Sequence, residues 1–154
     1  MNTLQVVTNS AIQTHKLGKK VGELLEEGDI ISLVGELGVG KTCFTQGIAK
    51  GLKIKDYVNS PTFIIIKCYE GRLPLYHFDL YRIHSLRELY EIGYEEYLYG
   101  KGVTVIEWGE KIKGLLPDTY LRVEIDWLAY TTRCFSFAPF SEHFQQLITH
   151  LSYI

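Results

Sequence analysis

The sequence predicts one α/β domain over residues 1–154, in which a mixed parallel and antiparallel sheet is flanked by helices. The first observation is Asp29–Val34, which reads as a short buried strand and is followed by a glycine-rich loop. The second is a helix period after that loop, with Phe44, Ile48 and Leu52 recurring every fourth residue. The third is a set of hairpin-like loops farther along the chain, which indicates antiparallel neighbours. A length of 154 residues suits one domain, and the chain has no repeat, low-complexity tract or linker.

The first half of the chain contains two further predicted units. Residues 1–9 alternate as an edge strand does, and Ser10 with Gln13 forms a capping box that opens a helix ending near Gly28. The apolar face of that helix comprises Leu17, Val21, Leu24 and Leu25. Residues 63–69 and 75–79 then read as two antiparallel strands joined by the loop at 70–74.

The second half is predicted from a second capping box, two strand signals and a terminal helix. Ser85 and Glu88 start a helix whose buried side carries Leu86, Leu89 and Tyr90. Residues 103–107 form an apolar strand, and 120–128 with 133–138 form an antiparallel hairpin. The last helix places its apolar residues on one face: Phe140, Phe144, Leu147, Ile148 and Leu151.

The loop after the first buried strand matches G-x-x-x-x-G-K-[ST], the phosphate-binding pattern of P-loop nucleotide hydrolases. Glycines let successive backbone N–H groups face phosphate oxygens. Lys41 would reach the β- and γ-phosphates, and the Thr42 hydroxyl would bind Mg²⁺. A glycine-rich turn that matches by chance is the alternative, but the order strand, loop, helix favours a single P-loop NTPase-like domain. The pattern comprises Gly35, Glu36, Leu37, Gly38, Val39, Gly40, Lys41 and Thr42.

Two hydrophobic strands end in an acid, at Asp79 and at Glu107. One acid would hold Mg²⁺ and the other would orient the attacking water, and spacing alone does not separate these roles. Trp108 reads equally as core or as a side chain that faces the nucleotide or a partner. His77 should share a strand face with Asp79, either tuning the acid or packed in the core. Arg82 is a partner either for phosphate or for a nearby carboxylate.

Composition and charge exclude several classes of function. The net charge of −2 and the lack of a basic run argue against direct RNA or DNA binding. Three widely spaced cysteines and five histidines form neither a disulfide framework nor a zinc pattern. No stretch is apolar enough for a bilayer and no signal peptide is visible, so we expect a cytoplasmic protein that does not enter membranes. The Asn-Lys-x-Asp element typical of guanine recognition is absent, which favours ATP over GTP.

Four ordered motifs resemble those of the TsaE (YjeE) family of bacterial ATPases in tRNA threonylcarbamoyladenosine biosynthesis. They are the P-loop at 35–42, Ser60-Pro-Thr-Phe63, His77-Phe-Asp-Leu-Tyr-Arg82 and Glu107-Trp-x-Glu110. The P-loop alone is generic, whereas the other three are specific. Cys43 replaces the commoner Thr or Ser after the P-loop and should be tolerated. The resemblance covers nearly the whole chain.

The resemblance implies an ATP-binding and weakly ATP-hydrolysing accessory subunit that uses Mg²⁺. Thr42 and Glu107 would lie at the metal, Asp79 near the γ-phosphate and Lys41 on the phosphates, which makes Asp79, Lys41 and Glu107 the catalytic set. Hydrolysis would reset a TsaB–TsaD complex that modifies adenosine 37 of tRNA, so tRNA would be met only through that complex. The free protein is expected to be a monomer. The remaining nucleotide contacts would be the P-loop with Cys43, and Ser10, Trp108 and Arg133.

Two other functions remain as alternatives. A P-loop small-molecule or nucleoside kinase would need lid arginines, and the five arginines of this chain are not clustered. A nucleotide-regulated binding module would need ATP but not its hydrolysis. The acidic cluster of Glu88, Glu91, Glu95 and Glu96 is interpreted as a solvated helix face rather than a binding surface.

Overall fold

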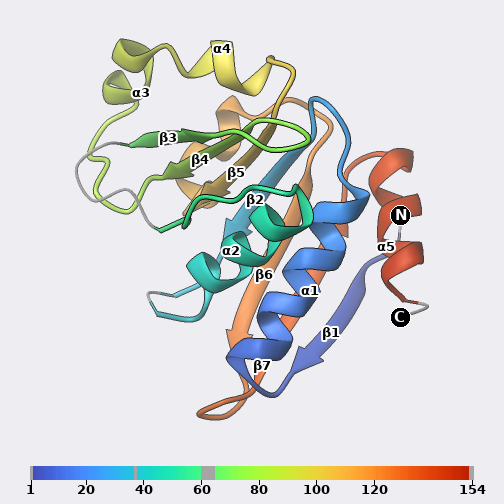
Figure 1. Cartoon of the computed structure of the whole chain (residues 1–154). Helices are drawn as coiled ribbons and strands as arrows, with labels where there is room; N and C mark the ends of the chain where they lie inside the picture. The colour runs from blue at the N-terminus through green and yellow to red at the C-terminus, as the bar shows by residue number, and fades with distance from the viewer. Residues whose placement is uncertain (1, 37, 60–64, 153–154) are drawn as a thin grey trace.

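The structure is a computed structural model of the chain, and it describes residues 2–36, 38–59 and 65–152. These residues form a seven-stranded mixed sheet with the order β1-β7-β6-β2-β5-β4-β3 (Figure 1). The parallel centre consists of β2, β4, β5 and β6, while β1, β7 and β3 add antiparallel pairs at the two sides. The mixed α/β architecture predicted from the sequence is confirmed. The strands are β1 (Leu4–Thr8), β2 (Ile30–Val34), β3 (Ile66–Tyr69), β4 (Leu75–Asp79), β5 (Val103–Glu107), β6 (Leu121–Trp127) and β7 (Arg133–Pro139).

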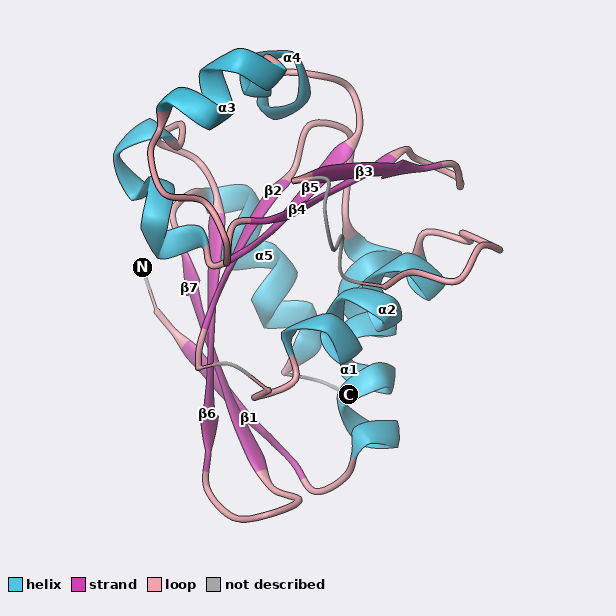
Figure 2. Ribbon diagram, turned by 90° about the vertical axis from the view of Figure 1, so that its left-hand side faces the viewer, coloured by secondary structure: helices cyan, strands magenta, loops and turns pink. Residues whose placement is uncertain are grey.

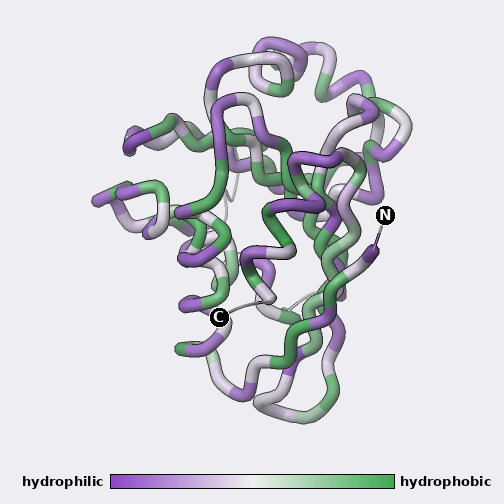
Figure 3. Tube along the Cα trace, turned by 90° about the vertical axis from the view of Figure 1, so that its right-hand side faces the viewer, coloured by the Kyte–Doolittle hydropathy of each residue, from purple (hydrophilic) through white to green (hydrophobic). Residues whose placement is uncertain are grey.

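Helices cover both faces of the sheet. On one face lie α1 (Ala11–Leu24), α2 (Lys41–Gly51) and α5 (Glu142–Leu151), which share one side of the sheet in Figure 2. On the other face, α3 (Arg87–Ile92), α4 (Tyr94–Leu98) and the 3-10 segment η1 (Gly109–Leu115) contribute to a second core. Successive strand residues therefore enter different cores: Ile30 and Ile106 enter the second, while Ile31 and Val105 enter the first. Figure 3 shows hydrophobic segments running through the interior, while many of the outer turns are hydrophilic.

Helices α1 and α2 cross with their backbones in direct contact. A Cβ atom added to Gly18 would lie 3.0 Å from the Cα of Gly47, and one added to Gly22 would lie 3.0 Å from the Cα of Gly51. Each helix thus presents two glycines four residues apart to the other helix. Because α2 follows the glycine-rich loop directly, this crossing holds the residues at the start of α2 in place.

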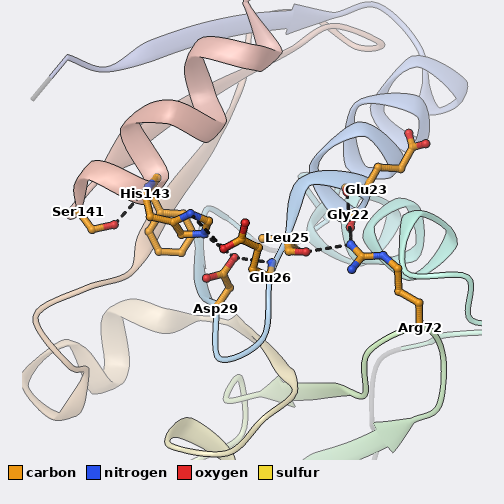
Figure 4. Close-up of polar contacts among 9 residues, drawn as sticks. Gly22, Glu23, Leu25, Glu26, Asp29, Arg72, Ser141 and His143 are labelled. Carbon is orange, nitrogen blue, oxygen red and sulfur yellow. Dashed lines mark hydrogen bonds and ion pairs between the residues drawn. The ribbon is translucent and has the colours of Figure 1, made fainter.

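The end of α1 differs from the prediction. The helix ends at Leu24, and Leu25 is already extended, so the expectation of an end near Gly28 was wrong by one turn. The Arg72 side chain accounts for the difference, because its Nη2 donates to the carbonyl oxygens of Gly22 (2.7 Å) and Leu25 (2.9 Å) (Figure 4). A long-range arginine therefore satisfies carbonyl groups that a C-terminal glycine motif would otherwise satisfy.

The turn between α1 and β2 is joined to α5 by a buried acid. Asp29 is 8% exposed, and its Oδ2 lies 2.9 Å from His143 Nε2 and accepts from the Glu26 N–H at 2.8 Å (Figure 4). Burial raises the pKa of Asp29, and the hydrogen bonds from His143 and Glu26 oppose that rise. Ser141 caps α5 by accepting from the Phe144 N–H at 3.2 Å. These contacts hold the last helix against the start of β2.

The helical segments on the second face are less regular than predicted. In α3 only Leu89 is buried, whereas Leu86 is 41% and Tyr90 55% exposed, so placing both on a buried side was wrong. The reason is that α3 has six residues and buries only a narrow face. Glu88 accepts from the Ser85 N–H at 3.2 Å, which is one half of the predicted capping box. No helix was predicted at Gly109–Leu115, where η1 forms.

Candidate functional site

The loop between β2 and α2 has a backbone that requires glycine. Gly38 and Gly40 have φ angles of 78° and 116°, in the left-handed region that residues other than glycine rarely adopt. Gly40 is also the N-cap of α2 and has no side chain to block the N–H groups that follow. Leu37, one of the predicted loop residues, lies outside the described residues, as does the Ser60–Phe63 motif. The loop thus has the glycine geometry and the helix N-terminus that anion binding uses.

Lys41 is buried at the start of α2 and points back over this loop. Lys41 is only 4% exposed, and its Nζ donates to the carbonyl oxygens of Gly35 (2.5 Å) and Glu36 (2.7 Å). The same nitrogen lies 4.0 Å from the centroid of the Trp108 ring. Burial lowers the pKa of Lys41, while the charges of Glu107 and Glu110 act in the opposite direction. The acids therefore favour the cationic form that phosphate recognition needs.

Thr42 and Glu107 meet at the base of the same site. The Thr42 hydroxyl donates to the Glu107 carboxylate, 3.1 Å from Oε1 and 3.3 Å from Oε2. Glu107 is 3% exposed at the end of β5, and its Oε2 also lies 2.5 Å from Nε2 of the fully buried His77. A hydroxyl and a carboxylate side by side are hard oxygen donors of the kind that Mg²⁺ prefers.

Asp79 lies beside Glu107 at the carboxyl edge of the sheet. Because β4 and β5 are parallel, the two residues are paired in register. Asp79 is half-buried, its Oδ1 accepts from the Tyr81 N–H at 3.0 Å, and its charge reaches Lys41. The two acid-ended strands singled out in the sequence are thus neighbours, and the charges of both acids act on the lysine of the loop.

Trp108 is partly buried and borders the loop. Its φ of 64° is unusual for a residue other than glycine, and strained backbone of this kind is frequent at functional sites. The ring packs against the second core, lies near Lys41 Nζ and contacts the Tyr81 ring in a tilted arrangement, with the ring centroids 5.2 Å apart. The core interpretation of Trp108 therefore holds in part, and a contact with nucleotide or partner stays a prediction.

A pocket of about 620 Å³ adjoins the loop on the side of the β6–β7 hairpin. Arg133 lines it and joins the loop to the hairpin, with Nε donating to the Val39 carbonyl of the loop at 2.9 Å and Nη1 to the Tyr130 carbonyl of the hairpin tip at 3.0 Å. The guanidinium carbon lies 5.2 Å from the Trp127 ring centroid. A pocket of this size suits a small ligand. Its lining includes Ser10, Thr14, Gly40, Cys43, Trp127 and Arg133.

The pocket contains residues that the sequence analysis predicted and others that it missed. Ser10 and Arg133 were expected at the site, and both line the pocket, although the Ser10 hydroxyl also accepts the Gln13 N–H at 3.1 Å as a helix cap. The hairpin tip at 127–131 was missed. A signal was present, because Trp-Leu-Ala-Tyr is unusually apolar for a turn, and Tyr130 is 94% exposed.

The remaining candidate residues differ in how near they lie to this site. Arg82 is exposed in the turn after β4, and Glu36 is exposed on the loop. Cys43 contacts the N-terminus of α1, with Sγ 3.4 Å from the Ala11 carbonyl oxygen. In the acidic cluster, Glu88 caps α3 and Glu91 forms an ion pair with Arg87 at 3.2 Å, as on a solvated helix face.

The site suits a metal ion only if a ligand supplies further donors. Within the ranges that the structure describes, no group of three or more His, Cys, Asp or Glu side chains is placed to hold a metal ion. Mg²⁺ commonly takes one or two protein oxygens and completes its shell with water and phosphate. Thr42 and Glu107 fit that donor set.

The described helices also include none with both the length and the apolar character needed to span a bilayer.

Comparisons with known proteins agree on one family. The family model described as threonylcarbamoyl adenosine biosynthesis protein TsaE matches residues 8–134. A Treponema pallidum protein named tRNA threonylcarbamoyladenosine biosynthesis protein TsaE is 46% identical over 126 residues, which are 82% of this chain and 93% of that protein. A Bacillus subtilis protein of the same name is 39% identical over 153 residues, 99% of this chain and 96% of the relative. The crystal structure of Bacillus subtilis YdiB superposes with a TM-score of 0.81 at 33% identity, covering 99% of this chain and 95% of that one.

Proposed function

The chain belongs to the TsaE family of threonylcarbamoyl adenosine biosynthesis proteins, and from this premise we propose that it binds and hydrolyses ATP as an accessory subunit of tRNA modification. Its hydrolysis would reset a TsaB–TsaD-type complex between turnovers. The observation that carries the proposal is the convergence of three chemistries at one edge of the sheet. These are the glycine loop with Lys41, the Thr42–Glu107 pair, and Asp79 in register with Glu107.

Each side chain has a role that follows from its position. Lys41 would exchange its bonds to the Gly35 and Glu36 carbonyls for phosphate oxygens, and the N–H groups at the start of α2 would face the same anion. Asp79 would accept a proton from the attacking water or orient it. Mg²⁺, held by Thr42 and Glu107, would supply charge neutralisation at the phosphate oxygens.

The pocket beside Arg133 is the proposed place for the base and ribose of ATP. It adjoins Gly40 and Cys43 at the start of α2, and the Trp127 ring offers an aromatic surface. Trp108 lies at the phosphate side, over Lys41, so it would shield the reacting end from water. The proposed nucleotide would therefore lie across the N-terminus of α2.

The modest net charge supports a protein partner over direct tRNA binding. The decisive experiment measures ATP turnover and multi-turnover formation of threonylcarbamoyladenosine, with and without the purified TsaB–TsaD pair. We expect weak turnover by the protein alone and strong stimulation by the pair. Fast turnover without the pair, or transfer of the γ-phosphate to a metabolite as in a kinase, would refute the proposal.

Two variants with matched controls complete that experiment. Lys41→Ala should weaken ATP binding by about 10- to 100-fold, the range for loss of a charged hydrogen bond, whereas Lys50→Ala on the exposed end of α2 should not. Asp79→Asn should lower turnover by about 100-fold or more and retain ADP binding, with the exposed Asp118→Asn as its control. Undiminished modification over many cycles with Asp79→Asn would instead identify a binding module.

A further inference from the structure

His77 occupies an unusual position for a polar side chain. It is 0% exposed, in the middle of β4, and is paired in register with Val105 of β5. Its Nε2 lies 2.5 Å from Oε2 of Glu107, which is two residues beyond Val105 on the same face of the neighbouring strand. The side chain therefore reaches along the sheet toward the end of β5, where Glu107 meets Thr42.

The hydrogen bond has one direction only. An ionised carboxylate can only accept, so the Nε2–H group is the donor and Oε2 of Glu107 the acceptor. The other ring nitrogen, Nδ1, is buried and has no hydrogen-bond partner among the described residues. A lone pair without a donor is a smaller cost than a buried N–H without an acceptor. The surroundings thus suit an imidazole ring whose one hydrogen bond is the one that Nε2–H donates to Glu107.

This donation restricts the Glu107 carboxylate. Both of its oxygens lie within reach of the Thr42 hydroxyl, at 3.1 Å and 3.3 Å, but only Oε2 also accepts the hydrogen bond from His77. The contact with His77 restricts rotation about the last side-chain bond of Glu107 and keeps the carboxylate beside the Thr42 hydroxyl. Carboxylates that bind metals commonly have such outer partners, and removing one lowers metal affinity.

We propose that His77 is a positioning residue that holds the Glu107 carboxylate toward Thr42 and thereby sets the affinity of the site for Mg²⁺. The inference rests on the proposed function, since it concerns the metal that would accompany ATP. His77 itself touches neither nucleotide nor metal. His77 affects metal binding only through the orientation of the two carboxylate oxygens of Glu107.

Four variants separate positioning from simple core packing. His77→Phe keeps a ring but removes the donor, and His77→Asn keeps an amide that is too short to reach Glu107. His77→Gln places an N–H at a similar distance along the side chain and serves as the rescue. Phe78→Leu disturbs the other face of the same strand, where Phe78 is fully buried in the second core, and controls for loss of packing.

The measurement is the affinity of Mn²⁺ for the protein–ADP complex, followed by electron paramagnetic resonance, beside ADP affinity in the absence of metal. Loss of the donor in His77→Phe and His77→Asn should weaken Mn²⁺ binding by about tenfold or more with metal-free ADP affinity unchanged. His77→Gln should restore Mn²⁺ affinity to within about threefold of the wild type. Phe78→Leu should leave Mn²⁺ affinity unchanged.

The outcomes distinguish failure of this inference from failure of the proposed function. Wild-type Mn²⁺ affinity in both His77→Phe and His77→Asn would overturn the role of His77 alone. The same loss in Phe78→Leu as in His77→Phe would show that packing, not positioning, is responsible. If the wild-type protein itself binds ADP without any contribution from Mn²⁺, the proposed function fails and the role of His77 with it.

Discussion

Alanine at position 47 should force the two glycine-bearing helices apart. A Cβ atom there would lie 2.2 Å from the carbonyl oxygen of His15 and 3.0 Å from both Gly18 Cα and Lys19 N. All three neighbours are backbone atoms of α1, so no side-chain rotation can relieve the contact. Because ordinary contacts of this kind need about 3.5 Å, α1 and α2 must move apart locally by about 1 Å.

The cost can be estimated from two opposing effects. Overpacking of a close-packed interior costs about 1–3 kcal/mol, and the upper end applies where only backbone can move. Alanine recovers about 1 kcal/mol relative to glycine within a helix. The net loss in free energy of unfolding is therefore about 2 kcal/mol, which corresponds to a fall in Tm of about 4–8 °C for a domain of this size.

Urea unfolding followed by circular dichroism measures this loss, and Gly114→Ala is the matched control. A Cβ atom on Gly114 meets no atom within 4 Å, and its φ angle is not in the left-handed region. The control should therefore change stability by about 0.5 kcal/mol or less. If Gly47→Ala were as stable as Gly114→Ala, the close backbone contact between α1 and α2 would be refuted.

Three further predictions follow from single contacts. Burial lowers the pKa of Lys41 from its ordinary value of 10.5, so just below that pH the unfolded chain binds more protons than the folded protein. The free energy of unfolding of the wild type, measured relative to Lys41→Met by urea titration, should therefore rise from neutral to alkaline pH. A flat or falling difference would contradict the direction of the pKa shift. Arg72→Leu removes hydrogen bonds to the end of α1 and should lower the free energy of unfolding by about 1–3 kcal/mol. The control Arg87→Leu, at an exposed position, should cost little. Equal losses in the two variants would argue against capping of α1 by Arg72. In calorimetric titrations, Trp127→Ala should weaken ADP binding by about tenfold or less and leave the binding of inorganic pyrophosphate unchanged. Equal losses of affinity for both ligands would show that the base does not bind in this pocket.

The strand, loop and helix around Lys41 could be predicted because their signals are local. A buried strand, glycines and a four-residue apolar repeat all fall within a window of about twenty residues, a range over which periodicity identifies elements. The acids at the ends of β4 and β5 were also visible, since each directly ends an apolar run. The sequence did not show that Glu107 accepts a hydrogen bond from Thr42, because that residue lies 65 positions earlier in the chain.

Two predictions were wrong because the tertiary structure overrides a local signal. The end of α1 was placed at a glycine, but Arg72 supplies the hydrogen bonds from about 50 residues away. The buried side of α3 was drawn from its apolar residues, but the short helix buries only Leu89. Similarly, the glycines of α1 and α2 show no apolar period, since their importance lies in how closely two backbones approach.

The class of domain, the glycine-rich loop before α2 and the two acids that end apolar strands could all be predicted, because each follows from the order and spacing of neighbouring residues. The adjacency of the strands depends on the tertiary structure, and with it the pairing of Asp79 and Glu107 in register. The tertiary structure also brought His77 to Glu107 across 30 residues and Arg133 to Val39 across 94. The physical reason is that such contacts depend on strand order and helix crossing, which are selected by burial of the whole core rather than by any short segment.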